Sequence, residues 1–174
     1  MRVLGIDPGS INTGYGIVDR GQNGSLVHIC DGAISPGAGL PIAERLLKVS
    51  EGLREVIGEH KPDAVSIESV FFAKNVKSAI TLGQARGAAL LSAAQFGLPV
   101  FEYAPTAIKL AVTGYGQADK VQVQKMVALL LKSAEGSKKA DASDALAIAI
   151  CHIHHYREAL SAAKRLASAS SRPR

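Results

Sequence analysis

The chain has 174 residues, of which 47% are hydrophobic and 20% charged, a composition that suits one domain with an ordinary buried core. It contains no apolar run of the roughly 18 residues that a membrane-spanning helix needs, and its N-terminus opens into a strand-like run without a signal-peptide pattern, so we expect a cytoplasmic protein with no membrane contact. The net charge of +5 is compatible with an anionic partner such as nucleic acid but does not establish one.

The first part of the chain predicts three antiparallel strands, a helix and a fourth strand. Strands are expected at residues 2–7, 13–19 and 26–34, with turn residues after the first and a hairpin turn at Gly21 to Gly24 before the third. Apolar residues at helical spacing between Pro41 and Pro62 predict a helix, and residues 63–68 follow as a strand. Because this strand is joined to the first through a helix, we expect the two to run parallel.

The second part alternates helices with one more strand. Helices are predicted at 76–97, 106–112, 120–131 and 140–156, with a strand at 99–103. The final residues are rich in Ala, Ser and basic side chains, so we expect a folded domain at 1–158 and a basic, disordered tail at 159–174. The element order predicts an α/β fold, with one mixed five-stranded sheet and helices on both faces.

Four carboxylates occupy positions that suit a metal site. Asp7 and Glu68 end two strands that we expect to run parallel, at the sheet edge where open α/β folds place their sites. Asp141 and Asp144 are three residues apart on one side of a predicted helix. Magnesium prefers oxygen ligands, and two such ions can activate a water for displacement at a phosphodiester. The acids therefore predict a divalent-metal pocket, because buried carboxylates are costly unless a cation neutralises them.

Each acid also has a purely structural interpretation. Asp7 suits a turn before Pro and Gly, Glu68 could be an exposed strand end, and the helical pair could cap its helix. The glycines around Asp7 favour the functional interpretation, since glycine lets a backbone approach a bulky ligand. These glycines are Gly9, Gly14 and Gly16.

Aromatic and basic residues near the acids indicate a nucleic-acid surface. Phe71 and Phe72 follow Glu68 in a predicted loop, where they are candidates for stacking on unpaired bases or, alternatively, for anchoring the loop to the core. Lys109 and Lys120 lie where loops meet helices and are placed to contact phosphates. A solvated surface explains any one of them better, but the neighbouring acids favour the DNA-facing interpretation for the set. The small residues of the helix at 76–97 suit either packing on the sheet or a dimer interface.

Three sequence blocks carry a resemblance to a known family. Residues 5–10 (Gly-Ile-Asp-Pro-Gly-Ser) with Thr13 and Gly14 resemble the opening motif of the bacterial Holliday junction resolvases of the RuvC family. Residues 67–72 (Ile-Glu-Ser-Val-Phe-Phe), Asn75 and residues 82–87 (Leu-Gly-Gln-Ala-Arg-Gly) resemble its second block, and residues 141–147 its third. The resemblance covers residues 2–155 in the right order.

The resemblance implies an RNase H-like fold, a homodimer, and Mg²⁺-dependent paired nicks in a four-way DNA junction during recombination and repair. It implies two Mg²⁺ per subunit, with Mn²⁺ as a substitute, and partnership with RuvA and RuvB. The metal-binding and catalytic residues that it implies are Asp7, Glu68, Asp141 and Asp144. The DNA-binding residues that we expect are Phe71, Phe72, Lys74, Asn75, Arg86, Lys109 and Lys120.

Other functions explain less of the sequence. A sugar-kinase or actin-like phosphotransferase needs a second domain and a second phosphate loop, for which the chain is short. A smaller RNase H-like nuclease acting on RNA would keep the acids but leave the Phe pair and the small-residue helix unexplained. An inactive DNA-binding module would not need all four acids.

Overall fold

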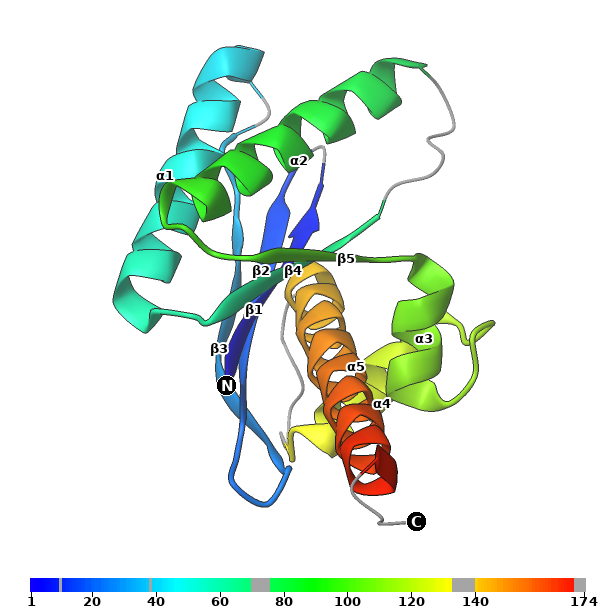
Figure 1. The fold of residues 1–174 in the computed structure, drawn as a ribbon. Helices are drawn as coiled ribbons and strands as arrows, with labels where there is room; N and C mark the ends of the chain where they lie inside the picture. The colour runs from blue at the N-terminus through cyan, green and yellow to red at the C-terminus, as the bar shows by residue number, and fades with distance from the viewer. Residues whose placement is uncertain (10, 38, 70–75, 133–139, 171–174) are drawn as a thin grey trace.

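The computed structural model describes residues 1–9, 11–37, 39–69, 76–132 and 140–170, with side chains up to Tyr156. Five strands form one sheet in the order β3-β2-β1-β4-β5 (Figure 1). They are β1 (Arg2–Pro8), β2 (Thr13–Arg20), β3 (Leu26–Ile34), β4 (Ala64–Glu68) and β5 (Val100–Tyr103). The first three are antiparallel neighbours, whereas β4 runs parallel to both β1 and β5. This is the mixed RNase H-like sheet that the sequence predicted.

Helices cover both faces of the sheet (Figure 1). One apolar core joins the sheet to α1 (Ile42–His60) and α2 (Val76–Gln95), and the other joins its opposite face to α3 (Pro105–Thr113), α4 (Lys120–Leu130) and α5 (Ala140–Ser170). The second core is centred on α5, whose residues 145–151 are all buried. The sheet therefore lies between two helical layers, and α5 is the helix that packs directly on β1 and β2.

Strand alternation decides which side of the sheet each acid occupies. On β1, Leu4 and Ile6 belong to the core under α1 and α2, so the odd-numbered positions face α5. On β4, Ile67 lies in that same core, and its predecessor Ser66 donates a hydrogen bond of 3.2 Å to the backbone carbonyl of Ile148 on α5. Asp7 and Glu68 continue the α5-facing rows of two adjacent parallel strands, so the fold itself brings their side chains to the same face.

Glycines on the first two strands make room for α5. A β-carbon at Gly5 would overlap the carbonyl oxygen of Ala145, and one at Gly14 would overlap the carbonyl oxygen of Asp141. At Gly16 it would lie 2.7 Å from Cγ of Leu146. We interpreted Gly14 and Gly16 as space for a ligand, but that space is filled by α5. The close approach of the helix carries its two aspartates to the sheet.

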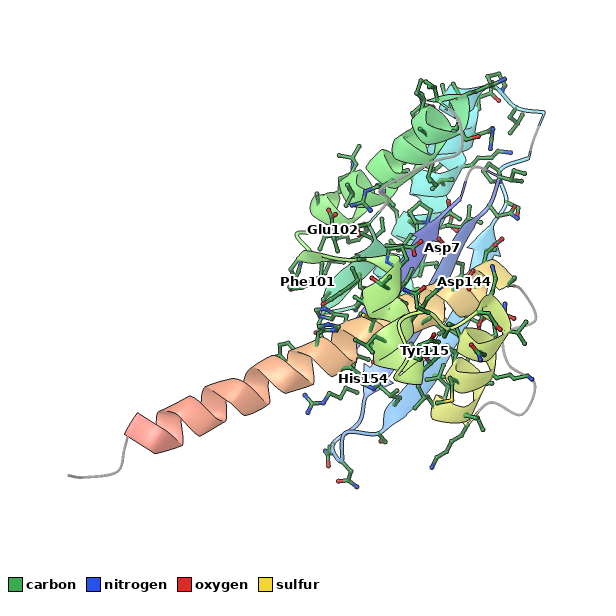
Figure 2. The ribbon with its side chains drawn as sticks, turned by 90° about the vertical axis from the view of Figure 1, so that its right-hand side faces the viewer. Asp7, Phe101, Glu102, Tyr115, Asp144 and His154 are labelled. Atoms are coloured by element: carbon green, nitrogen blue, oxygen red, sulfur yellow. The ribbon has the colours of Figure 1, made fainter. Side chains whose placement is uncertain are left out.

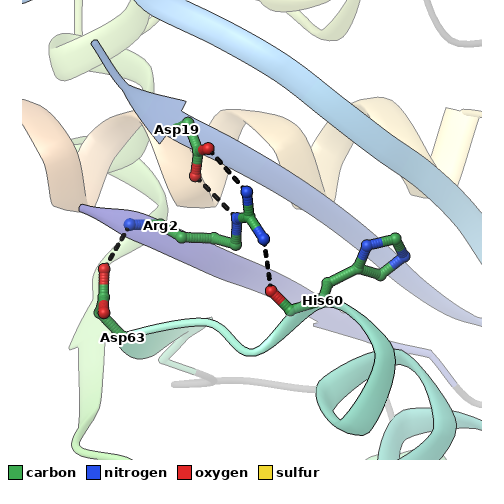
Figure 3. Close-up of polar contacts among 4 residues, drawn as sticks. All are labelled: Arg2, Asp19, His60 and Asp63. Carbon is green, nitrogen blue, oxygen red and sulfur yellow. Dashed lines mark hydrogen bonds and ion pairs between the residues drawn. The ribbon is translucent and has the colours of Figure 1, made fainter. Parts of the chain in front are cut away.

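Arg2, at the start of β1, forms a hydrogen-bond network at the end of the sheet opposite Asp7 and Glu68 (Figure 3). Its guanidinium donates two hydrogen bonds of 2.9 Å to the Asp19 carboxylate on β2 and one of 2.6 Å to the carbonyl of His60 at the end of α1. The backbone nitrogen of the same Arg2 donates to Asp63 before β4. This network holds the segment between α1 and β4 against β1, and so fixes the register of β4 against β1.

The last helix is longer than we predicted. The sequence interpretation ended it at Tyr156 and placed a disordered tail at 159–174, whereas α5 continues to Ser170. Ala, Leu, Arg, Lys and Glu dominate the added segment and are the strongest helix formers, while Pro173 is the first residue that opposes a helix. The predicted helix end at Tyr156 was therefore wrong, while the disordered tail at 159–174 stays a prediction. The assignment of the nuclease domain to residues 1–158 remains a proposal.

Candidate active site

Three of the four predicted acids line one cavity of about 200 Å³ at the carboxyl ends of β1 and β4. Asp7 comes from β1, Glu68 from β4 and Asp144 from α5. Figure 2 shows Asp7 and Asp144 where the sheet meets this helix. Lys109 of α3 and Lys120 of α4 also line the cavity. Its apolar wall consists of Pro105, Ile108, Val123, Ala147 and Ile148.

The fourth acid lies beside this cavity rather than in its lining. Asp141 is in the first turn of α5, and its Oδ2 accepts a hydrogen bond of 3.2 Å from the side-chain amide of Asn12. Asp144 is one turn further along the helix and faces the cavity. Sequence reasoning missed Asn12, although its place in the segment between Asp7 and β2 was a usable signal. The two helical aspartates therefore differ in environment, which their spacing alone did not reveal.

A capping box sets the position of Lys120. The Asp119 side chain accepts a hydrogen bond of 2.8 Å from the backbone nitrogen of Gln122, and the Gln122 side chain accepts one of 2.9 Å from the backbone nitrogen of Asp119. This arrangement fixes the first turn of α4, which begins at Lys120. The Lys120 ammonium then pairs with Oδ2 of Asp144 at 2.6 Å. One of the predicted phosphate-binding lysines is thus held against a predicted metal ligand.

Burial and like charges raise the pKa of two of the acids. The pKa of Asp7 rises from its usual 3.8 to about 7, chiefly because the group is buried and further because Asp144, Glu68 and Asp141 are near. Burial, with the charge of Asp144, also raises the pKa of Glu68, while Lys109 and Lys120 act in the opposite direction. The bond to Asp144 raises the pKa of Lys120. The site therefore carries more negative charge than its two lysines offset.

The raised pKa of Asp7, caused first by burial and then by the neighbouring acids, predicts that Asp7→Asn stabilises the metal-free protein at alkaline pH. A carboxyl whose pKa rises from 3.8 to about 7 on folding keeps its proton only in the folded state between these values, so stability falls as the pH rises through that window. At pH 8 in EDTA, we expect the variant to gain about 1–3 kcal/mol in the free energy of unfolding. Urea unfolding at pH 8 and pH 4 measures this difference, which should nearly vanish at pH 4. Equal stability of the two proteins at pH 8 would contradict the electrostatic account.

The chemistry of the donor set fits a divalent cation. Three carboxylates facing one partly buried cavity form an oxygen-rich, anionic set of the kind that Mg²⁺ prefers. Within the described part of the chain, no three Asp, Glu, His or Cys side chains converge closely enough to hold a metal ion in their present positions. One oxygen of Asp144, Oδ2, is paired with the Lys120 ammonium at 2.6 Å. Metal binding would compete with this ion pair for the Asp144 carboxylate.

The predicted DNA contacts have different outcomes. Phe71, Phe72, Lys74 and Asn75 lie outside the described residues. Lys109 and Lys120 both reach the acidic cavity. Arg86 does not, because its guanidinium is engaged within the protein: it donates to the backbone carbonyl of Glu68 and pairs with Glu102. Our assignment of Arg86 as a DNA contact followed from its being one of several basic residues near the acids, a pattern that carries no information about internal partners.

Comparison with known proteins agrees with this geometry. The family model described as "Crossover junction endodeoxyribonuclease RuvC" matches residues 3–152. A relative from Chloroflexus aggregans with the same description is 53% identical over 155 residues, covering 88% of this chain and 93% of the relative.

Two solved structures share the fold over nearly their whole length. The structure of Thermus thermophilus RuvC matches with a TM-score of 0.85 at 33% identity, covering 91% of this chain and 97% of the other. The structure of T. thermophilus RuvC in complex with Holliday junction substrate matches with a TM-score of 0.83 at 30% identity, covering 91% and 96%. The extent of these matches, together with the three sequence blocks around the acidic cavity, shows that this chain belongs to the RuvC family of crossover junction endodeoxyribonucleases.

Proposed function

We propose that this chain cuts four-way DNA junctions by paired, symmetric, Mg²⁺-dependent nicks, and so resolves Holliday junctions in homologous recombination and DNA repair. The observation that carries the proposal is the cavity in which carboxylates from β1, β4 and α5 meet two lysines. Membership of the RuvC family and the T. thermophilus complex with Holliday junction substrate support the choice of DNA junction as the substrate. The products would carry 5′-phosphate and 3′-hydroxyl ends.

Four acids are assigned to hold the metal. Asp7, Glu68 and Asp144 face the cavity, and Asp141 lies beside it in contact with Asn12. When bound, two Mg²⁺ ions per subunit, for which Mn²⁺ would substitute, would supply the Lewis acidity for in-line displacement at phosphorus. Once its carboxylate partner is engaged elsewhere, the Lys120 ammonium is free to bind a phosphate next to the scissile bond. Lys109 is placed to do the same from the other wall.

The segment that follows Glu68 completes the proposed DNA surface. Phe71 is assigned to stack on a base at the opened junction, with Phe72, Lys74 and Asn75 as neighbouring contacts. Support for these roles comes from the sequence block that this segment shares with the family. Arg86 is left out of this set because both of its polar contacts are internal.

A substrate comparison separates this function from its main alternative. The alternative is an RNase H-like nuclease that acts on RNA, which would use the same acids. We expect the protein with Mg²⁺ to cut a synthetic four-way DNA junction far faster than an RNA–DNA hybrid of the same sequence. Preferential cleavage of the hybrid would replace the present proposal with the RNA-directed one.

A homodimer would present two such cavities to a two-fold symmetric junction. The exposed side of α2 offers a surface for a second copy: Ile80 is 56% exposed and Leu91 58% exposed, and a β-carbon at either Gly83 or Gly87 would meet nothing within 4 Å. Apolar side chains beside open glycines permit close helix approach. We therefore assign the dimer contact to this face of α2.

The assignment predicts that Leu91→Glu separates the dimer. Placing a carboxylate in an apolar contact costs several kcal/mol, so we expect the dimer dissociation constant to rise by about 100-fold or more. Sedimentation velocity at micromolar concentration measures this change. Leu129→Glu is the matched control, because Leu129 is 70% exposed on α4, away from α2. A wild-type monomer, or a Leu91→Glu dimer of wild-type affinity, would contradict the assignment.

The cellular setting completes the proposal. No helix in the described ranges combines the length and apolarity that crossing a membrane requires. We assign the protein to the cytoplasm, where bacterial DNA lies, and propose RuvA and RuvB, the branch-migration proteins, as its partners. The family membership supports both assignments.

A further inference from the structure

An internal arginine bridges two strands beside the acidic cavity. Nη1 of Arg86, on α2, donates a hydrogen bond of 2.7 Å to the backbone carbonyl of Glu68, the last residue of β4. Nη2 pairs with Oε2 of Glu102, on β5, at 2.6 Å. The Arg86 side chain is only 15% exposed, whereas that of Glu102 is 51% exposed. Figure 2 shows Glu102 beside Phe101 on this strand, at the edge of the sheet.

The bond to Glu68 acts at the place where the strand ends. Ser69 donates one further backbone hydrogen bond of 2.8 Å, to the carbonyl of Tyr103, and β4 itself stops at Glu68. The direction of a side chain at a strand end depends on the backbone angles of that residue. Hydrogen bonds to the neighbouring strands no longer fix these angles on both sides. A planar guanidinium that binds two acceptors at once supplies the missing constraint, because its two N–H groups have a fixed separation.

The backbone and the side chain of Glu68 are contacted from opposite faces of the sheet. Arg86 belongs to α2, which packs on the face opposite α5. The Glu68 carboxylate lies on the α5 side, where it lines the cavity. Arg86 therefore holds the backbone of Glu68 from behind while the carboxylate points forward into the site. The low exposure of the Arg86 side chain and its two contacts inside the protein disfavour a direct contact with a DNA phosphate.

We propose that Arg86 is a positioning residue, which together with Glu102 fixes the end of β4 so that the Glu68 carboxylate is held ready for metal binding and phosphodiester cleavage. This inference rests on the proposed function of Glu68 as a metal-binding acid. Arg86, whose Nη1 lies 2.7 Å from the backbone oxygen of Glu68, thus acts in the site without contacting DNA or metal.

Four variants test this role. Arg86→Met removes both contacts, and Arg86→Lys restores one charge-assisted bond but not the fork. Glu102→Gln keeps an oxygen acceptor without the charge, at a position where the side chain is 51% exposed. Arg54→Met, at an exposed position on α1, is the matched control. Thermal melting of each variant establishes that it is folded before it is assayed.

The expected pattern separates positioning from DNA contact. A misplacement of about 1 Å at a reacting group costs on the order of 100-fold, so single-turnover cleavage of a four-way junction should fall by about 30–100-fold in Arg86→Met and by about 3–10-fold in Glu102→Gln. Arg86→Lys should fall between these two, and Arg54→Met should match the wild type. Junction affinity in Ca²⁺ and its salt dependence should not change, whereas a lost phosphate contact would lower the salt slope by about 1.

Calorimetric titration of Mn²⁺ without DNA supplies a second readout. We expect Arg86→Met to bind Mn²⁺ several-fold more weakly than the wild type, and Arg54→Met to bind it equally well. Wild-type cleavage by Arg86→Met, or a reduced salt slope, would overturn the positioning role while leaving the proposed function intact. A wild-type protein that does not cut junctions would instead overturn the proposed function. The Mn²⁺ titration would then still decide whether Arg86 supports the acidic site.

Discussion

Asp7→Asn should abolish cleavage of a four-way DNA junction while leaving junction binding almost unchanged. Asp7 is the acid most enclosed by the others, since Asp144, Glu68 and Asp141 all raise its pKa. Its replacement by a neutral amide of the same shape removes the charge that a divalent cation would bind, and leaves Lys109 and Lys120 to bind phosphates. We expect single-turnover cleavage in Mg²⁺ to fall by about 1,000-fold or more, which is about 4 kcal/mol of transition-state stabilisation.

Asp31→Asn is the matched control for this loss. Asp31 is an aspartate on β3, at the far side of the sheet from β4, where it pairs with His28 at 2.7 Å. The same change of carboxylate to amide there should leave the rate of cleavage at the wild-type level. Gel-shift titration in Ca²⁺ compares junction affinities of the variants without turnover. Robust cleavage by Asp7→Asn would show that the acidic cavity is not the active site.

Gly5→Ala should be among the most destabilising single-methyl changes in the chain. The added carbon would overlap the carbonyl oxygen of Ala145 and lie 2.8 Å from the backbone nitrogen of Ala149. Both atoms belong to the backbone of α5, so no side chain can rotate away, and the helix itself must move off the sheet. We expect a loss of about 3 kcal/mol or more in the free energy of unfolding. Because α5 carries Asp144, the folded fraction should also cut slowly.

Gly58→Ala makes the same chemical change without the clash. A β-carbon at this position in α1 would meet nothing within 4 Å, and alanine is the better helix former by about 0.8–1.0 kcal/mol. This variant should be slightly more stable than the wild type and equally active. Urea unfolding of both variants measures the difference. A Gly5→Ala protein as stable as Gly58→Ala would show that α5 does not pack on β1 as closely as described.

The part of the site built by the sheet was predictable from sequence. Alternation along two short apolar runs places Asp7 and Glu68 on one face, and the helical connection between the runs makes the strands parallel. The part of the site that α5 contributes was less predictable from sequence. Asp141 and Asp144 share a side of the helix, and only the packing of α5 on Gly5, Gly14 and Gly16 decides which of the two enters the cavity.

Two interpretations from the sequence overlooked internal contacts for the same physical reason. Gly14 and Gly16 were assigned to a ligand and Arg86 to DNA, yet all three serve contacts between segments far apart in the chain. A sequence pattern shows that a residue is small or basic but does not show which other segment will lie against it. The end of α5 illustrates the reverse case: local helix propensity, which is in the sequence, extends the helix to Ser170 although the segment has a low apolar content.

Strand-specific mapping of the cut sites shows whether two acidic cavities act together on one four-way junction, as we propose. Each strand of a synthetic junction is labelled in turn at its 5′ end and incubated with the wild-type protein in Mg²⁺. We expect nicks at symmetric positions in two opposed strands, with labelled fragments that carry 3′-hydroxyl ends and no comparable cutting of linear duplex of the same sequence. Nicks at unrelated positions in all four strands, or equal cutting of the duplex, would contradict it.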